Sequence, residues 1–243
     1  MNHTFIHRYE LDQSRPTVGS ALRDAALRAL APALGLFAII LGIGFLITGP
    51  LGGLPWEEDL SRSVASGRTE LWNSLTMVWS RIGNTEIIIG VCIIVVALVW
   101  WRTKQWWYAV VPAIAIAMQA SVFVAATTIA DRPRPKVEHL DPAPPTSSYP
   151  SGHVGAATAL YLVFALMAQR IERAWLRRLV TVVCAVVPFL VAYARLYRGM
   201  HHLVDILVGA VNGIVCALLA WNYLRRRTGS DRVGEKARQA VSR

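Results

Sequence analysis

The amino-acid sequence predicts an all-α, polytopic membrane protein with six transmembrane helices and an interfacial amphipathic segment. Its composition supports this prediction, because 54% of the 243 residues are apolar and only 16% are charged. The apolar residues also gather in repeated runs, which are too long and too numerous for the core of a globular domain. Polar and proline-rich segments separate these runs, so we expect a single helical membrane domain.

The first predicted span is the uncharged run Ala29–Thr48, which at about 1.5 Å per residue crosses a hydrocarbon layer about 30 Å thick. Residues 1–28 are polar and mixed in charge, and we expect them to form a cytoplasmic tail with an interfacial helix from about Gly19. The segment from Leu54 to Arg81 mixes tryptophans with acidic and basic residues. That mixture is typical of an amphipathic segment at the membrane interface, where indole rings lie at headgroup depth.

Five further apolar runs complete the expected membrane domain over residues 29–224. Their predicted ranges are 84–101, with a start at Ser80 or Asn84, then 105–130, 154–169, 179–194 and 202–224. The loop at residues 131–153 is rich in proline, which disfavours a helix there. Residues 225–243 are expected to form a basic cytoplasmic tail.

The basic connections of this topology all fall on one side of the membrane. They are residues 1–28, 102–104, 170–178 and 225–243. By the positive-inside rule that side is the cytoplasm. The remaining polar segments then meet on the extracytoplasmic face, and we expect the chain to lie in the inner (plasma) membrane of a bacterial cell.

Several other classes of function are disfavoured by the sequence. The net charge of +10 does not predict nucleic-acid binding, because Arg and Lys are scattered between apolar runs. Cys92, Cys184 and Cys216 each lie alone in an apolar run, so neither disulfides nor a cysteine metal site are expected. Nucleotide-binding glycine motifs are absent from the sequence. We expect no cofactor, and we expect membrane lipids to surround the protein. The sequence gives no indication of the oligomeric state.

An ionisable cluster from Arg195 to Asp205 lies between the last two apolar runs, where such groups indicate a functional site. If a helix begins near Gly199, His201 and Asp205 are four residues apart on one face. The carboxylate would then orient the imidazole and strengthen it as a nucleophile, while Arg195 would attract an anionic substrate. A polar cap on a membrane helix is the alternative interpretation.

Two clusters upstream also suit an anion. Ser151 is the expected N-cap of the fourth span, and with Gly152 after it the helix start would offer free backbone N–H groups, with His153 at the rim. Arg132 and Arg134, each followed by proline, present two guanidinium groups on a stiffened backbone. The alternative for this pair is a loop attracted to anionic lipid headgroups.

In chain order, the Arg-Pro pair, Pro-Ser-Gly-His and Arg-x5-His-x3-Asp resemble the three-part signature of the type 2 phosphatidic acid phosphatase superfamily, the lipid phosphate phosphatases. The resemblance spans the third to the sixth predicted helix. It implies six membrane helices, a site outside the cytoplasm and metal-independent cleavage of a phosphate monoester or diphosphate. It assigns the family's site positions to Arg134, Ser151, Gly152, His153, Arg195, His201 and Asp205.

The chain departs from the family pattern at two positions. The family usually has Lys seven residues before Arg134, where this chain has Thr127, and Ser before Arg195, where this chain has Ala194. Loss of the lysine removes one cation from the expected phosphate cradle. Three other cations are candidates to replace it, namely Arg132, Lys136 and Arg198.

These residues predict a membrane lipid phosphatase that acts through a phosphohistidine. His201 would attack phosphorus, and His153 would protonate the leaving oxygen and then activate water. Phosphatidic acid, phosphatidylglycerol phosphate and a polyprenyl diphosphate all fit as lipid substrates. A lipid phosphotransferase, or a phospholipid-binding or transport protein with impaired catalysis, are the alternatives. A metal site made of His153, His201, His202 and Asp205 is disfavoured, because two arginines would share the pocket with the cation.

Overall fold

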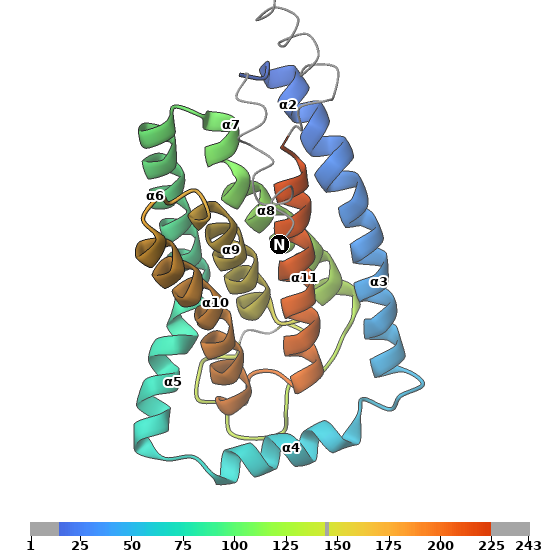
Figure 1. Ribbon diagram of the computed structural model, residues 1–243. Coiled ribbons are helices and arrows are strands. Elements are labelled where there is room, and N and C mark those ends of the chain that lie inside the picture. The colour runs from blue at the N-terminus through green and yellow to red at the C-terminus, as the bar shows by residue number, and fades with distance from the viewer. Residues whose placement is uncertain (1–14, 144–145, 225–243) are drawn as a thin grey trace, which may run out of the picture.

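The computed structural model describes residues 15–143 and 146–224, which form helices and connecting loops without any strand. In chain order the helices are α2 (Val18–Ala25), the π-helical turn η1 (Ala26–Leu30), α3 (Ala31–Thr48), α4 (Pro55–Ser66), α5 (Glu70–Ile82), α6 (Thr85–Thr103), α7 (Trp106–Ala109), α8 (Val111–Ile129), α9 (Gly152–Ala168), α10 (Ala174–Tyr197) and α11 (Leu203–Asn222) (Figure 1). Residues 1–14 and the predicted tail 225–243 lie outside the described part of the chain.

The prediction of an all-α polytopic membrane protein is confirmed. Within the described ranges, five helical stretches are long and apolar enough to cross a membrane: Val18–Thr48, Thr85–Thr103, Trp106–Ile129, Ala174–Tyr197 and Leu203–Asn222. The predicted fourth span corresponds to α9, which is apolar but shorter, with 17 residues. These six segments follow the order that the sequence predicts.

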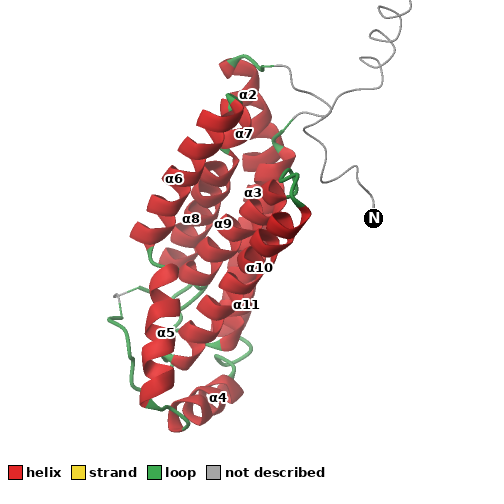
Figure 2. Ribbon diagram, turned by 60° about the vertical axis from the view of Figure 1, so that its left-hand side comes forward, coloured by secondary structure: helices red, strands yellow, loops and turns green. Residues whose placement is uncertain are grey.

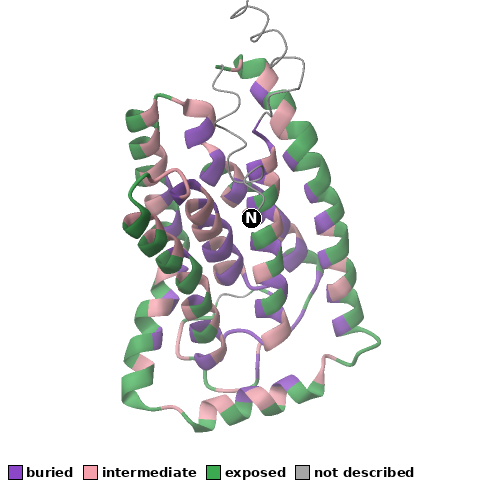
Figure 3. Cartoon of the chain, viewed as in Figure 1, coloured by how far each residue is buried: buried purple, intermediate pink, exposed green. Residues whose placement is uncertain are grey.

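Helix α9 lies inside the bundle, packed against α8, α10 and α11 (Figure 2). Leu160 and Val163 on α9 are fully buried. By contrast, Ile93 on α6 and Phe189 on α10 are large apolar side chains that are exposed. Buried residues face the middle of the bundle and exposed ones its outside (Figure 3). An apolar outer surface of this extent is what contact with lipid requires.

The first membrane helix begins earlier than predicted. The Thr17 hydroxyl caps α2 by accepting a hydrogen bond from the Ser20 N–H at 3.3 Å, and the helix continues through η1 into α3. The π-helical turn ends two residues before Pro32, which has no N–H to donate to the carbonyl of Arg28. A wider turn accommodates that missing hydrogen bond. The helix expected from about Gly19 is therefore the start of the first span.

The predicted amphipathic segment forms two helices, which separate at Gly67. Helix α4 crosses the end of the bundle, whereas α5 stands upright beside α10 (Figure 1). On α4 the buried positions are polar: Glu57 is fully buried and Ser61 is 3% exposed. On α5, Trp72 and Trp79 pack edge to face with Tyr193 of α10. Helix α4 therefore covers the end of the bundle that holds the polar clusters.

Small residues allow α9 and α11 to approach closely. A Cβ atom at Gly209 would lie 2.4 Å from the carbonyl oxygen of Ser151, and one at Gly213 would lie 2.5 Å from that of Gly155. Because side chains are absent at these glycines, the Ser151 N–H reaches the carbonyl oxygen of Asp205 at 2.9 Å. This packing joins the second sequence cluster directly to the third.

Candidate active site

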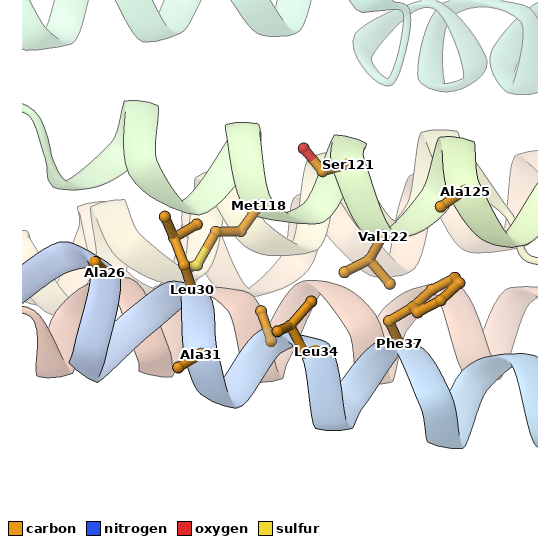
Figure 4. Close-up of a pocket in the computed structure, with 10 residues that line it drawn as sticks. Ala26, Leu30, Ala31, Leu34, Phe37, Met118, Ser121, Val122 and Ala125 are labelled. Atoms are coloured by element: carbon orange, nitrogen blue, oxygen red, sulfur yellow. The ribbon is translucent and has the colours of Figure 1, made fainter.

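Two cavities differ sharply in chemistry. One, of about 540 Å³, lies between the η1–α3 segment and α8 and is lined by apolar side chains and Ser121 (Figure 4). The Ser121 hydroxyl donates to the Ala117 carbonyl at 2.8 Å, so its polar group is already satisfied. The other cavity, of about 410 Å³, is lined by Arg134, His153, Arg195 and His201. We therefore take the second cavity as the candidate site.

Three distant segments supply the polar lining of this cavity. Arg134 comes from the loop after α8, His153 from the start of α9, and Arg195 from the end of α10. The convergence of the three sequence clusters at one place is thus observed. The apolar part of the lining comes from α6 and α8, with Ile88, Ile89, Ile116, Phe123 and Val124 among its residues. Charge and apolar surface share one cavity, as binding of a lipid phosphate requires.

The guanidinium of Arg134 is only partly used by the protein. Its Nη1 donates to the Met200 carbonyl at 2.7 Å, and its Nη2 lies 3.5 Å from the Thr146 hydroxyl. Its buried Nε has no hydrogen-bond partner in the described part of the chain. Burial lowers the pKa of Arg134, although the Asp205 carboxylate opposes that shift. An anionic ligand would accept a hydrogen bond from the Arg134 Nε and neutralise the guanidinium charge.

The guanidinium group of Arg195 is bonded to the protein along one edge only. Its Nη1 donates to Ser80 at 2.9 Å and to an Asp141 carboxylate oxygen at 2.8 Å. Arg195 is 4% exposed, and its buried Nε has no partner among residues 15–143 and 146–224. The other Asp141 oxygen accepts from Arg198 Nε at 2.9 Å. Asp141 was not foreseen from the sequence, and it fixes the arginine while leaving its second edge open.

His201 lies in the turn between α10 and α11, so the expected shared helix face with Asp205 is wrong. Helix α11 begins only at Leu203. The His201 Nδ1 lies 2.7 Å from the backbone carbonyl of Ser148, which makes that carbonyl, rather than a carboxylate, the group that orients the ring. Burial lowers the pKa of His201 well below its ordinary value, and the nearby Arg195 and Arg134 charges act in the same direction. The imidazole is therefore neutral and its Nε2 holds a lone pair.

Asp205 serves as the third residue of α11 and closes a capping box with His202. Its carboxylate accepts from the His202 N–H at 2.9 Å and from the Ser148 hydroxyl at 2.6 Å. It also pairs with Arg132. Because Ser148 bonds His201 through its carbonyl and Asp205 through its hydroxyl, it links the two residues that the sequence pairs directly.

Arg132 belongs to a buried ion network instead of the cavity. It pairs with Asp205 and, at 2.6 Å, with Glu57 of α4, and it donates to the Gly53 carbonyl at 2.9 Å. Burial opposes its charge, but Asp205 and Glu57 outweigh that effect, so the pKa of Arg132 is raised. Arg132 thereby ties α4 to α11.

Neither Thr127, which stands where the family usually has lysine, nor the three cations expected to replace that lysine line the cavity. The Thr127 hydroxyl donates to the Ser147 carbonyl at 3.3 Å. The backbone N–H of Lys136 donates to Glu58 at 3.1 Å, and Arg198 is engaged by Asp141. Of the residues that line the cavity, Arg134 and Arg195 carry the cationic side chains.

Helix α9 begins where the sequence predicts, with Ser151 as its N-cap. The buried Ser151 hydroxyl makes no hydrogen bond within the described residues, and the next residue, Gly152, rather than Ser151 itself, lines the cavity. Gly152 lies against Phe123, where a Cβ atom would lie 2.7 Å from the ring. The His153 Nε2 lies 3.1 Å from the side-chain oxygen of Asn84, the N-cap of α6. That asparagine, like Asp141 and Ser148, carries no signal in the sequence beyond its polarity.

His202 is held between two acids, with its Nε2 3.3 Å from Glu58 and its Nδ1 3.3 Å from Asp205. It is 3% exposed and is the N-cap of α11, so it is a buried helix cap. Across the described ranges, no group of three or more His, Cys, Asp or Glu side chains is arranged to hold a metal ion.

Comparison with known proteins agrees with this arrangement. The model of the PAP2 superfamily matches residues 104–229, more than half of the 243-residue chain. A transmembrane PAP2-type phosphatidylglycerolphosphate phosphatase from Bacillus subtilis aligns with a TM-score of 0.67 at 21% identity, over 77% of this chain and 93% of that one. Aquifex aeolicus LpxE aligns with a TM-score of 0.54 at 21% identity, over 67% and 92%. Curated protein sequences give no match.

At 21% identity the two solved structures support the fold alone. The family assignment rests on the match over residues 104–229. This range includes α8, the loop that carries Arg134, and helices α9, α10 and α11. The chain belongs to the PAP2 superfamily.

Proposed function

We propose that the protein is a membrane lipid phosphatase that hydrolyses a phosphate monoester or diphosphate. The observation that carries this proposal is the cavity in which Arg134 and Arg195 keep unpartnered donors beside two imidazoles and an apolar wall. A binding protein needs the cations, but it has little use for a neutral imidazole fixed by a carbonyl.

The phosphoryl group would be held by donors that the protein leaves unmet. The Nε atoms of Arg134 and Arg195 and the Ser151 hydroxyl are buried and have no partner in the described residues. The first backbone N–H groups of α9 also lack acceptors within the helix. Donors fixed in advance stabilise the charge that develops on the equatorial phosphate oxygens during transfer.

Hydrolysis would proceed in two steps. In the first, the His201 Nε2 lone pair forms a bond to phosphorus, the bond from phosphorus to the lipid oxygen breaks, and His153 gives that oxygen a proton. In the second, His153 takes a proton from water, the oxygen attacks phosphorus, and the P–N bond breaks to release inorganic phosphate and neutral His201. Ser148 keeps the His201 Nδ1 occupied, so that the opposite nitrogen reacts.

A lipid substrate is supported by the apolar walls from α6 and α8. Phosphatidic acid, phosphatidylglycerol phosphate and polyprenyl diphosphate remain the proposed classes, and a structural neighbour is itself described as a phosphatidylglycerolphosphate phosphatase. We further propose that the cavity end of the bundle faces away from the cytoplasm of a bacterial cell, since the short connections at the opposite end are basic.

Release of inorganic phosphate from these three lipids by detergent-solubilised protein tests the proposal. We expect turnover with EDTA present and none above background in His201→Ala. Full phosphate release by His201→Ala would reject the mechanism, and loss of activity in EDTA would reject metal independence. Transfer of the phosphoryl group to an added alcohol, without free phosphate, would indicate a phosphotransferase.

A further inference from the structure

Gln119 of α8 is a polar side chain that the proposed chemistry leaves unused. It lines the cavity and is 2% exposed. Its amide nitrogen is buried and finds no acceptor within the described residues. An amide without a partner inside a membrane protein is costly, and polar groups at such depth commonly mark functional positions. A hydrogen-bond acceptor on a bound ligand would satisfy this amide.

The amide lies about one helical turn below the start of α9. A Cβ atom at Gly155 would lie 2.3 Å from the Gln119 Nε2, so the amide rests on the backbone of Gly155. Gly152, three residues earlier and about 4.5 Å higher along the helix axis, lies instead against Phe123. The cavity thus offers phosphate donors at the level of Gly152 and an amide one turn deeper.

The backbone of α8 is anchored at this same residue. The Asn212 side-chain amide donates to the Gln119 backbone carbonyl at 3.4 Å. This contact joins α8 to α11 and does not involve the Gln119 side chain. Replacement of the side chain therefore leaves the link between the two helices in place.

We propose that Gln119 donates a hydrogen bond to an ester carbonyl of the lipid and thereby selects a glycerolipid phosphate over a polyprenyl phosphate. The inference rests on the proposed function. In an acylated glycerol phosphate, ester carbonyls lie a few bonds from phosphorus, which matches a donor one turn below the phosphate donors. A polyprenyl chain has no acceptor there, so it leaves the amide buried and unpaired. A site built for a hydrogen bond discriminates against a ligand that cannot form it.

Three substrates in mixed micelles test this inference with the full-length protein: dioleoyl phosphatidic acid, its dialkyl ether analogue without carbonyls, and a polyprenyl monophosphate. We expect the wild-type kcat/KM to be about tenfold higher for the ester lipid than for the ether lipid. Gln119→Leu should remove most of that ratio, mainly through a higher KM for the ester lipid. Its kcat/KM for the ether and polyprenyl substrates should change little.

Thr158→Val is the matched control, because the Thr158 hydroxyl is also buried and unpartnered in the described structure but does not line the cavity. It should keep the wild-type ratio. Equal wild-type rates for ester and ether lipids would overturn the inference without any variant, as would a Gln119→Leu protein with an unchanged ratio. Absence of phosphate release from all three lipids would instead overturn the proposed function itself.

Discussion

The ion network around Arg132 and the cavity around Arg134 adjoin each other, yet they treat their charges in opposite ways. Arg132 is matched by Glu57 and Asp205, and both of its terminal nitrogens have partners. Arg134 keeps one buried donor unmet in the described structure and meets no carboxylate at hydrogen-bond distance. Charges that the chain pairs fully therefore hold the fold, whereas charges that it pairs only in part are available to a ligand.

The largest expected effect comes from breaking the network. Arg132→Gln leaves Glu57 and Asp205 buried without their cation, which costs about 3–5 kcal/mol. We expect a strong fall in the yield of monodisperse protein and in the apparent melting temperature in detergent. The double variant Arg132→Gln/Glu57→Gln should recover part of the loss. Wild-type thermal stability of the single variant would contradict the structural role of Arg132.

Arg134→Gln should lower activity and leave stability nearly unchanged. Removal of a charged donor from the transition state lowers kcat by about 10²–10³-fold, while the apparent melting temperature stays near that of the wild type because the network is intact. Phosphate-release kinetics and a thermal-shift measurement on the same preparation separate the two effects. If Arg134→Gln unfolded the protein as readily as Arg132→Gln, the distinction between the two arginines would fail.

Ser148→Ala tests the junction between network and cavity. It removes the hydroxyl that donates to Asp205 but keeps the carbonyl that orients His201. We expect kcat/KM to fall by about ten- to a hundredfold, since a hydrogen bond to a charged group is worth about 1.5–3 kcal/mol. Ser121→Ala, in the apolar cavity, is the matched control and should retain full activity. An equal loss in both variants would show that the Ser148 hydroxyl has no specific role in catalysis.

The smallest expected effect is a pH dependence of stability from His201. Because its pKa in the folded protein lies well below the ordinary value, the unfolded chain binds more protons below about pH 6.5. Stability should therefore fall as the pH drops below that value, by at most about 1.4 kcal/mol per pH unit. The apparent melting temperature of His201→Asn should fall less steeply over the same range. Parallel curves for the two proteins would argue against a buried neutral imidazole.

Much of the fold was predictable because long apolar runs report membrane helices directly, and even α9 was placed correctly. The boundaries were harder. The motif spacing between His201 and Asp205 fits either a continuous helix or a turn followed by a capped helix, and only the structure shows α11 beginning at Leu203. Gly199, with φ of 72°, allows the sharp turn that follows α10.

The motif residues of the site were predictable, but their partners were not. Asp141 and Ser148 meet Arg195 and His201 across more than 50 positions of sequence, and no local pattern reports such contacts. The charges give a weak indication, since several buried arginines at one end of a membrane bundle require acids nearby. That reasoning would favour Glu57 and Asp141 as candidates without deciding which arginine each one pairs.

The most direct test follows the phosphoryl group itself. Protein mixed with a ³²P-labelled lipid phosphate monoester is quenched within milliseconds at alkaline pH, digested, and the labelled peptide is sequenced by mass spectrometry. We expect transient, acid-labile label on His201 and none in His201→Ala. Label on another residue, or none on His201 during active turnover, would rule out the phosphohistidine mechanism.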